Sequence, residues 1–185
     1  MHSQGEISSS QGIIDNNPFP YYIAMIESID YEMGRLLRTI PSYQKENTLI
    51  IFLGDNGTPG KVIQVPYEIN RSKGSLHQGG IHVPLVISGP LVTRKGERDQ
   101  SLIHTADIFS TIAEAAGINE SKYFNSQSFY NTLSNSTTSA RAYNYSEILD
   151  EDKPAKSGFT IRNDRYKLIV LDNNSYRFYD LKIDV

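Results

Sequence analysis

The sequence contains no cysteine among its 185 residues and no long run of apolar residues. Without cysteine, the composition gives no indication of redox compartment. A transmembrane helix needs an apolar segment of about 18 residues or more, so no membrane span is predicted. A charged start followed by an apolar run is also missing, so no signal peptide is predicted. A chain that lacks an N-terminal half would lack its signal as well.

A surplus of positive charge is absent too. Lys and Arg number 18 against 21 Asp and Glu, the formal net charge is -3 and the pI is about 5.8. The basic residues are scattered, and they form no basic face of the kind that binding to a phosphate backbone demands. We therefore expect no nucleic-acid partner. With 38% hydrophobic residues, the chain is expected to be a soluble globular unit with one core.

The most informative segment is the apolar run TLIIFL at residues 48–53, which ends in GDNG at residues 54–57. Such a run predicts a buried strand of the kind found in parallel sheets, and ligands gather beyond the carboxyl ends of these strands. Asp55 and Asn56 lie at that end. Their carboxylate and amide oxygens suit Ca²⁺ or Mg²⁺ better than a thiophilic metal. The alternative is an ordinary turn, because Asp-Asn-Gly is also a common turn sequence.

A glycine-rich loop follows, with Lys73 among Gly74, Gly79 and Gly80. A cation on a backbone that can approach closely is what an oxyanion site requires, although many Lys-Gly loops are only solvated loops. His77 lies four residues after Lys73, where it could line the pocket and donate a proton near neutral pH. His2 and His104 have no partners by spacing and are interpreted as structural or solvated.

The order of these pieces resembles the sulfatase family, a branch of the alkaline phosphatase superfamily. The series runs from the strand through Asp-Asn-Gly, Lys-Gly and Gly-Gly to a Val-Pro strand start. Residues 22–37 resemble the family's long helix before that strand, residues 105–117 its next helix, and residues 165–169 and 179–181 its C-terminal strands. Most of the chain falls into register with the second half of a sulfatase.

The resemblance implies roles for three residues. Asp55 and Asn56 match two ligands of a single divalent cation, usually Ca²⁺, and Lys73 matches a lysine that binds the sulfate. A metal and an ammonium group would neutralise charge on the sulfuryl oxygens as the ester bond breaks. The phosphatase and phosphodiesterase relatives typically have His next to the Asp. Asn56 therefore favours sulfate esters.

The chain also departs from the family pattern. Gln78 and His82 stand where many members have Glu and Arg. Sulfatases use a Cys or Ser in a Cys/Ser-x-Pro-x-Arg motif, which is oxidised to formylglycine and serves as the nucleophile. This sequence has no cysteine and no Ser-x-Pro-x-Arg. The strand that brings two further Asp ligands is missing as well. The full catalytic machinery is therefore not expected from this chain alone.

The expected fold class is α/β: part of an alkaline-phosphatase-like sheet flanked by helices, followed by a small C-terminal antiparallel sheet. We predict a mobile segment at 1–20, the C-terminal part of the sulfatase α/β domain at 21–118, a linker loop at 119–139 and a small antiparallel β subdomain at 140–185. Helices are expected at 22–40 and 105–116, with Thr105 as N-cap, Gly117 as C-cap, and Ile108, Phe109, Ile112 and Ala116 facing inward. Strands are expected at 48–53, 83–88, 143–147, 158–162, 166–171 and 176–181.

Three functions remain open from sequence. The first is a sulfuric ester hydrolase portion that acts on a sulfate ester. The second is a non-catalytic pseudoenzyme or interaction module, and the third is a phosphoryl-transfer relative. A severed sheet and an amphipathic helix would favour a homo-oligomer. The family resemblance implies a periplasmic, secreted or lysosomal setting, but the sequence itself indicates no compartment and no natural substrate.

Overall fold

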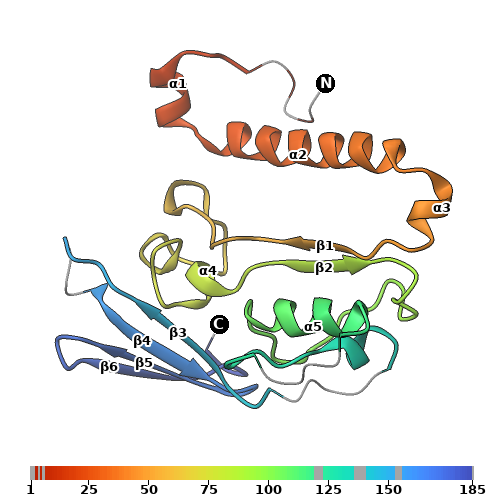
Figure 1. The fold of residues 1–185 in the computed structure, drawn as a ribbon. Helices are drawn as coiled ribbons and strands as arrows, with labels where there is room; N and C mark the ends of the chain where they lie inside the picture. The colour runs from red at the N-terminus through yellow and green to blue at the C-terminus, as the bar shows by residue number, and fades with distance from the viewer. Residues whose placement is uncertain are drawn as a thin grey trace.

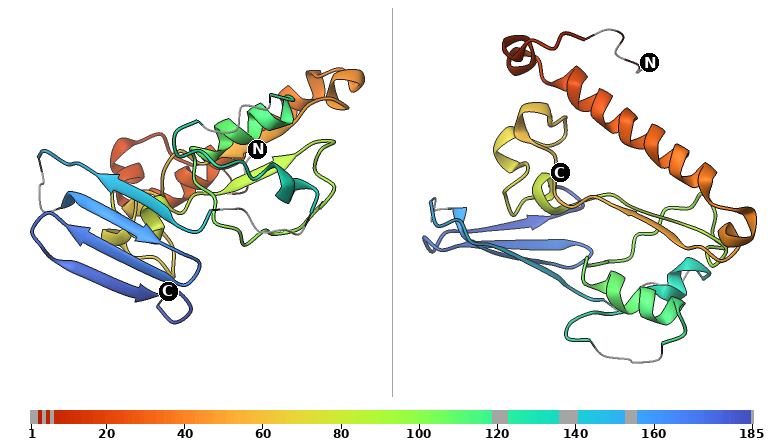
Figure 2. Two further views of the ribbon diagram at one scale, coloured as in Figure 1. Left: turned by 60° about the horizontal axis from the view of Figure 1, so that its bottom comes forward. Right: turned by 45° about the horizontal axis from the view of Figure 1, so that its top comes forward.

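The structure is a computed structural model that describes residues 3, 5, 7–118, 123–135, 141–152 and 156–184. Helix α2 runs along one side of a two-stranded ribbon, α5 lies on the opposite side, and a four-stranded sheet closes one end (Figures 1 and 2). The elements in chain order are α1 (Gln11–Asn16), α2 (Phe19–Thr39), α3 (Ser42–Lys45), β1 (Ile50–Leu53), η1 (Gly60–Val62), η2 (Ile69–Arg71), α4 (Gln78–Ile81), β2 (Leu85–Ser88), α5 (Asp107–Ala115), η3 (Tyr130–Leu133), β3 (Asn144–Ile148), β4 (Gly158–Arg162), β5 (Tyr166–Leu171) and β6 (Tyr176–Asp180).

Helix α2 confirms the predicted long helix. It begins at Phe19, and Pro20 lies in its first turn, where the missing amide hydrogen costs nothing. It ends at Thr39, because Ile40 adopts an extended conformation before Pro41. The apolar stripe in its sequence predicts a core face unless the segment that would cover it is missing, and among the described residues that face is largely uncovered. Only Ala24 is buried, whereas Met25 is 64% exposed and Ile29 is 53% exposed. Periodicity predicts an apolar face, but it does not specify what covers that face.

Strand β1 forms within the expected range, but it is not buried as predicted, since Phe52 is 38% exposed and the other three residues are half-buried. Its pairing also differs from the expectation. It pairs antiparallel with β2, with Ile51 opposite Ile87 and Leu53 opposite Leu85. A continuous apolar run indicates burial on two faces and says little about strand direction, so the parallel assignment had no further support. Along the described ranges, no helix combines the length and hydropathy that crossing a bilayer requires.

Helix α5 turns the opposite face inward from the one predicted. Asp107, Ser110 and Thr111 are buried, whereas Phe109 is 54% exposed and Ile112 is 49% exposed. Ala116 is exposed as well, and of the four residues expected to face inward only Ile108 is half-buried. The reason is a segment that follows the helix: Phe129, 2% exposed, packs there, and its backbone N–H donates to the Thr111 hydroxyl at 3.1 Å.

The ends of α5 confirm one of the two predicted caps. Gly117 adopts φ +76°, and the next amide, that of Ile118, bonds the carbonyl of Ala113 at 2.9 Å, which closes the helix as predicted. At the other end Thr105 makes no capping bond, and the helix begins at Asp107. The Asp107 carboxylate instead accepts the backbone N–H of His104 at 2.7 Å.

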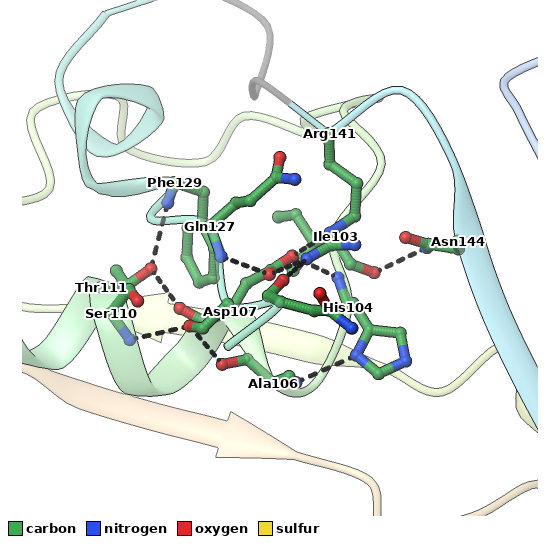
Figure 3. A network of polar contacts seen from close by, with 12 residues as sticks. Ile103, His104, Ala106, Asp107, Ser110, Thr111, Gln127, Phe129, Arg141 and Asn144 are labelled. Carbon is green, nitrogen blue, oxygen red and sulfur yellow. Dashed lines mark hydrogen bonds and ion pairs between the residues drawn. The ribbon is translucent and has the colours of Figure 1, made fainter. Parts of the chain in front are cut away.

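A buried ion pair joins α5 to the segment that leads into β3. Arg141 Nε donates to Asp107 Oδ2 at 2.6 Å, a second Arg141 nitrogen bonds Oδ1, and the Gln127 N–H donates to Oδ1 at 2.9 Å. Figure 3 shows these groups converging on the Asp107 carboxylate, which is 1% exposed as a residue. Every oxygen of this buried carboxylate is therefore satisfied, as stability requires.

The C-terminal sheet is antiparallel in the order β3-β4-β5-β6, which confirms the predicted small sheet. Asn163 Oδ1 accepts the amides of Arg165 and Tyr166 in the first hairpin turn, and Asn174 adopts φ +61° in the second. The predicted linker at 119–139 contains η3 and buried Leu133, while residues 119–122 and 136–140 lie outside the described residues. Helix α1 lies within the segment predicted to be mobile, where residues 1, 2 (His2), 4 and 6 are outside the described residues. The mobility of that segment remains a prediction.

Candidate functional site at the end of β1

The segment after β1 is fastened to the glycine-rich loop by backbone hydrogen bonds. Gly54 N–H donates to Pro84 O at 3.0 Å, Gly57 N–H to Gly80 O at 2.9 Å, and Lys73 N–H to Thr58 O at 2.9 Å. These bonds hold Asp55 and Asn56 between the end of β1 and the loop that carries Lys73.

Glycine is required at the closest approach of the two segments. A Cβ on Gly57 would lie 2.1 Å from Gly79 O, and a Cβ on Gly80 would lie 2.2 Å from Ser75 O. No side chain fits at either distance, so the contact depends on bare backbone. Gly74, at φ +79°, has open space around it and is needed only for its backbone conformation.

A cavity of about 370 Å³ lies between this junction and the C-terminal sheet. Asp55 and Asn56 line it from the end of β1. Gln78 and His82, the two departures from the family pattern, line it from α4 and the residue after it. The sheet contributes five polar or charged residues from β3 and β4: Asn144, Ser146, Glu147, Thr160 and Arg162. We call this space the site cavity.

The side chain of Asn56 gives the clearest indication that a ligand binds here. Its amide nitrogen donates to the Asp55 carboxylate, while its Oδ1 is buried and has no hydrogen-bond partner among the described residues. A carboxylate and an unpartnered amide oxygen, side by side, are hard oxygen donors. Within the part of the chain that the structure describes, no three His, Cys, Asp or Glu side chains come together as a metal-binding group.

Lys73 and His77 occupy different places from this pair. Lys73 is exposed on the loop after η2, next to Gly74 at the cavity wall, and its own side chain is not part of the cavity lining. His77 lies at the start of α4, with its Nε2 3.4 Å from the Tyr179 hydroxyl and 3.5 Å from Arg177 Nη1. The structure therefore brings Asp55 and Asn56 together and sets His77 toward β6.

Burial and positive neighbours lower the pKa of both loop histidines. Burial, with Arg71, Arg177 and Lys167 nearby, lowers the pKa of His77 to about 4. Burial also lowers the pKa of His82, helped by Arg162 and Lys167. At neutral pH the His77 ring carries no extra proton to give, so as a proton donor it could use only its neutral N–H. His104, as expected, has structural bonds to Tyr145 and Ala106.

Sequence analysis did not single out the residues that the C-terminal sheet contributes. The tyrosine rings of the predicted sheet were expected to pack, and no other side chain of the sheet was a candidate. In the structure Asn144 and Arg162 face each other across β3 and β4 and both line the site cavity. Alternation along β4 was the available signal, because Thr160 and Arg162 share a face.

Comparison with known proteins identifies the family. Residues 3–118, more than half of the chain, match the Sulfatase family model. The chain belongs to the sulfatase family. Residues 72–185 also match the family described as N-sulphoglucosamine sulphohydrolase, C-terminal. Both matches confirm the resemblance inferred from the ordered motifs.

Two relatives show how much of a sulfatase is present. An arylsulfatase of Klebsiella aerogenes is 31% identical over 139 residues, covering 55% of this chain and 30% of that protein. A sulfatase of Formosa agariphila is 32% identical over 107 residues, covering 52% of this chain and 19% of that protein. The chain thus spans less than a third of the length of these sulfatases.

Solved structures share the fold. A protein in complex with its substrate D-glucosamine-2-N,6-O-disulfate superposes with a TM-score of 0.74 at 23% identity, covering 89% of this chain and 34% of that one. A phosphonate monoester hydrolase of Agrobacterium radiobacter gives a TM-score of 0.70 at 23% identity, covering 89% and 35%. These likenesses confirm the predicted alkaline-phosphatase-like α/β fold of a sulfatase.

Proposed function

We propose that this chain supplies the cation-binding and sulfate-binding part of a sulfuric ester hydrolase. Asp55 and Asn56 would hold a divalent cation, Ca²⁺ or Mg²⁺, and Lys73 would bind the sulfate. The observation that carries the proposal is the buried, unpartnered Oδ1 of Asn56 beside the Asp55 carboxylate at the wall of the site cavity. A buried acceptor without a donor is costly unless a ligand meets it.

The oxygen atoms of Asp55 and Asn56 are of the type that a hard cation prefers, but they are too few to fill its coordination shell. Ca²⁺ takes about six to eight oxygens, and Asp55 with Asn56 offers only the first of them. Only one of the two side chains is charged, so attraction for the cation is weak. The remaining ligands would come from water or from a further protein segment. We therefore expect Ca²⁺ affinity in the millimolar range or weaker for the chain alone, with a tight site only in the complete enzyme.

The division of chemistry follows from the same residues. A bound cation would neutralise charge on the nonbridging oxygens of the sulfuryl group. Lys73, exposed beside the open backbone of Gly74, is free to reach an anionic group and stabilise charge that develops on it. Covalent catalysis also needs an activated nucleophile, and the sequence has neither cysteine nor Ser-x-Pro-x-Arg. The isolated chain is therefore expected to have no sulfatase activity.

The test uses the DNA upstream of the Met1 codon. If that frame is open and encodes Cys/Ser-x-Pro-x-Arg, the continuous protein, expressed with a formylglycine-generating system, should hydrolyse a chromogenic aryl sulfate. Asp55→Ala and Lys73→Ala should each abolish turnover, whereas the 185-residue chain should show none. Turnover by the pure 185-residue chain that Lys73→Ala removes would contradict the proposal that the chain is inactive alone. A contaminating sulfatase would survive that substitution.

A second candidate is phosphoryl transfer, favoured by the structural likeness to the phosphonate monoester hydrolase. Asn56 next to Asp55 favours sulfate instead, since the two-metal relatives typically have His there. The continuous protein should therefore prefer an aryl sulfate over the matching phosphate monoester and phosphonate monoester. A preference for either phosphorus ester would reverse this assignment.

A third candidate is a non-catalytic interaction module that pairs with a second copy. Its support is the apolar face of α2, where Met25 is 64% and Leu36 is 61% exposed. Light scattering at micromolar concentration should give at least a dimeric mass, and Met25→Glu with Ile29→Glu should return the mass to that of a monomer. A monomeric mass for the unmodified chain would remove the support for this candidate.

A further inference from the structure

Asn56 is the one asparagine of the sequence that precedes a glycine, Gly57. The side-chain amide of an asparagine can be attacked by the backbone nitrogen of the residue that follows it. The attack is easiest before glycine, because glycine has no side chain to obstruct the approach. The close contact of Gly57 with Gly79 and Gly80 depends on the same missing side chain. The residue that permits the contact therefore also makes Asn56 the most reactive asparagine of the unfolded chain.

The reaction is a deamidation that needs only the chain and water. The Gly57 nitrogen gives up its proton and bonds to Asn56 Cγ, the Cγ–Nδ2 bond breaks, and Nδ2 takes up a proton and leaves as ammonia. The product is a succinimide ring, which water then opens at one of its carbonyl carbons. Opening at Cγ gives aspartate. Opening at the backbone carbon gives isoaspartate, in which the main chain runs through the former side chain.

Hydrogen bonds hold both reacting groups in the folded chain. The Gly57 N–H donates to Gly80 O at 2.9 Å, so the attacking nitrogen keeps its proton and points to the glycine-rich loop. The nitrogen that would leave, Asn56 Nδ2, donates to the Asp55 carboxylate, and the Asn56 residue is half-buried. A backbone amide held in this way reacts only when its segment opens locally, so the rate of reaction depends on how often the junction opens.

We propose that Asn56 is a deamidation site whose reaction is controlled by the backbone contact between Gly57 and Gly80. While the contact is closed the Asn56 amide persists, and each opening of the junction allows the Gly57 nitrogen to attack. This inference goes beyond the proposed function, because the reaction involves neither a sulfate ester nor a bound cation. It can therefore hold or fail whatever the chain binds at Asp55 and Asn56.

Both products weaken the junction that had protected the amide. Isoaspartate lengthens the main chain before Gly57 by one carbon, and the contact has no room even for a Cβ on Gly57. The contact cannot form again in the same register. Aspartate keeps the length of the main chain but places a second carboxylate beside Asp55, and neighbouring carboxylates repel each other. Deamidation is therefore a change that refolding does not reverse.

Peptide mass spectrometry of the 185-residue chain at neutral pH tests the inference. One sample stays folded in buffer, a second is unfolded in urea, and aspartate and isoaspartate at position 56 are quantified over time. We expect the folded chain to react at least about tenfold more slowly, which corresponds to a free energy of local opening of about 1.4 kcal/mol or more. A peptide of residues 51–60, followed with and without urea, corrects for any effect of urea on the reaction itself.

Hydrogen exchange at Gly57 measures the same opening without chemical change. The Gly57 amide of the folded chain should exchange more slowly than an unfolded amide, because its proton is bonded to Gly80 O. The factor of protection from exchange should be similar to the factor of protection from deamidation at Asn56. This agreement is expected only if one opening controls both reactions.

Variants separate the contact from the stability of the whole chain. A Cβ added by Gly80→Ala would lie 2.2 Å from Ser75 O, so the junction must shift and the Asn56 rate in buffer should rise toward the rate in urea. Gly12→Ala, the same substitution in α1 with nothing within 4 Å of the added Cβ, is the matched control and should leave the rate unchanged. Thermal melting checks that each variant is folded.

Asp55→Ala is a second variant that adds no atom to the contact. It frees Asn56 Nδ2 and should raise the rate by about two- to tenfold, the factor that loss of one hydrogen bond predicts. Equal rates in buffer and in urea, after the peptide correction, would overturn the inference, because the contact would then give no protection. Protection of Asn56 together with free exchange of the Gly57 amide would overturn it as well, since another feature would then be protecting the side chain.

Discussion

Asp55 follows the end of β1 and Asp107 begins α5, but the two carboxylates differ in burial and in the number of hydrogen bonds that they accept. Asp107 is 1% exposed, and its oxygens accept bonds from Arg141 and from the backbone of His104 and Gln127. Asp55 is exposed, accepts one bond from Asn56, and lies beside an amide oxygen that has no partner. A fully satisfied carboxylate holds the fold together, whereas an unsatisfied pair at a cavity is available for a ligand.

The largest expected effect concerns Asp107, the carboxylate whose oxygens are all hydrogen-bonded. Asp107→Ala should lower the free energy of unfolding by about 3–5 kcal/mol, because it leaves the Arg141 guanidinium buried without its counter-ion. Urea denaturation followed by circular dichroism measures the change. Asp55→Ala, as control, should stay within about 0.5 kcal/mol of the unmodified chain. Similar losses for both variants would remove the distinction between the two carboxylates.

The next effect concerns Lys167, a buried charge that has no ion pair with any described carboxylate. Lys167→Met should raise the free energy of unfolding at pH 7 by about 1–4 kcal/mol, since an apolar side chain avoids the cost of burying the ammonium. The pKa near 8 in the fold lies below the usual value, so stability should rise as pH increases from about 8 to 10.5. That rise should vanish in Lys167→Met.

The matched control for that experiment is Lys73→Met, which changes the same residue type at an exposed position. It should change stability little and leave the rise between pH 8 and 10.5 intact. If Lys167→Met were destabilising at pH 7, the ammonium would have a favourable role in the folded chain that the structure does not display.

A smaller effect is expected from His77. Its pKa of about 4 in the fold lies below the ordinary 6.5, so the unfolded chain binds the proton more readily. Stability from this group is therefore fully present above pH 6.5 and is lost as pH falls toward 4, by about 1–3 kcal/mol. His77→Gln should flatten the acid limb of the unfolding curve over this window. An unchanged acid limb would show that the ring is more exposed to solvent than its contacts suggest.

The smallest expected effect is the stabilisation of the chain by Ca²⁺ bound at Asp55 and Asn56. With millimolar affinity, Ca²⁺ at 1 mM should stabilise the chain by no more than about 0.5 kcal/mol, and Asp55→Ala should remove that increment. Calorimetry and thermal melting with and without a chelator measure it. Micromolar binding would contradict the weak-site argument unless a second copy supplied carboxylates, which light scattering in the same buffer would reveal.

Local chemistry made much of the fold predictable. Pro41 ends α2, Gly117 ends α5, and Asn163 and Asn174 turn the hairpins, so these boundaries could be predicted from single residues. Which segment packs on which face of a helix could not be predicted. Phe109 was assigned inward because it is apolar, but the segment around Phe129 packs on the other face of α5.

The candidate site was predictable to a similar degree. Asp55 and Asn56 follow a strand and stand out by chemistry, and the structure places them together at a cavity. Their roles, with those of Lys73 and His77, remain predictions. Arg162 and Lys167 become notable only through strand register and burial, because a cation in a short strand ordinarily reaches solvent.

The bare-backbone contact between Gly57 and Gly80 bears on how this chain can change over generations. Every missense change of a glycine codon adds at least a Cβ, and at these two positions even a Cβ collides with backbone. A lineage under no selection for the Asp55–Asn56 end would lose this contact to random substitution while its C-terminal hairpins could still fold. Both glycines are present in this chain, and neither can be replaced without a shift of the backbone around Asp55 and Asn56.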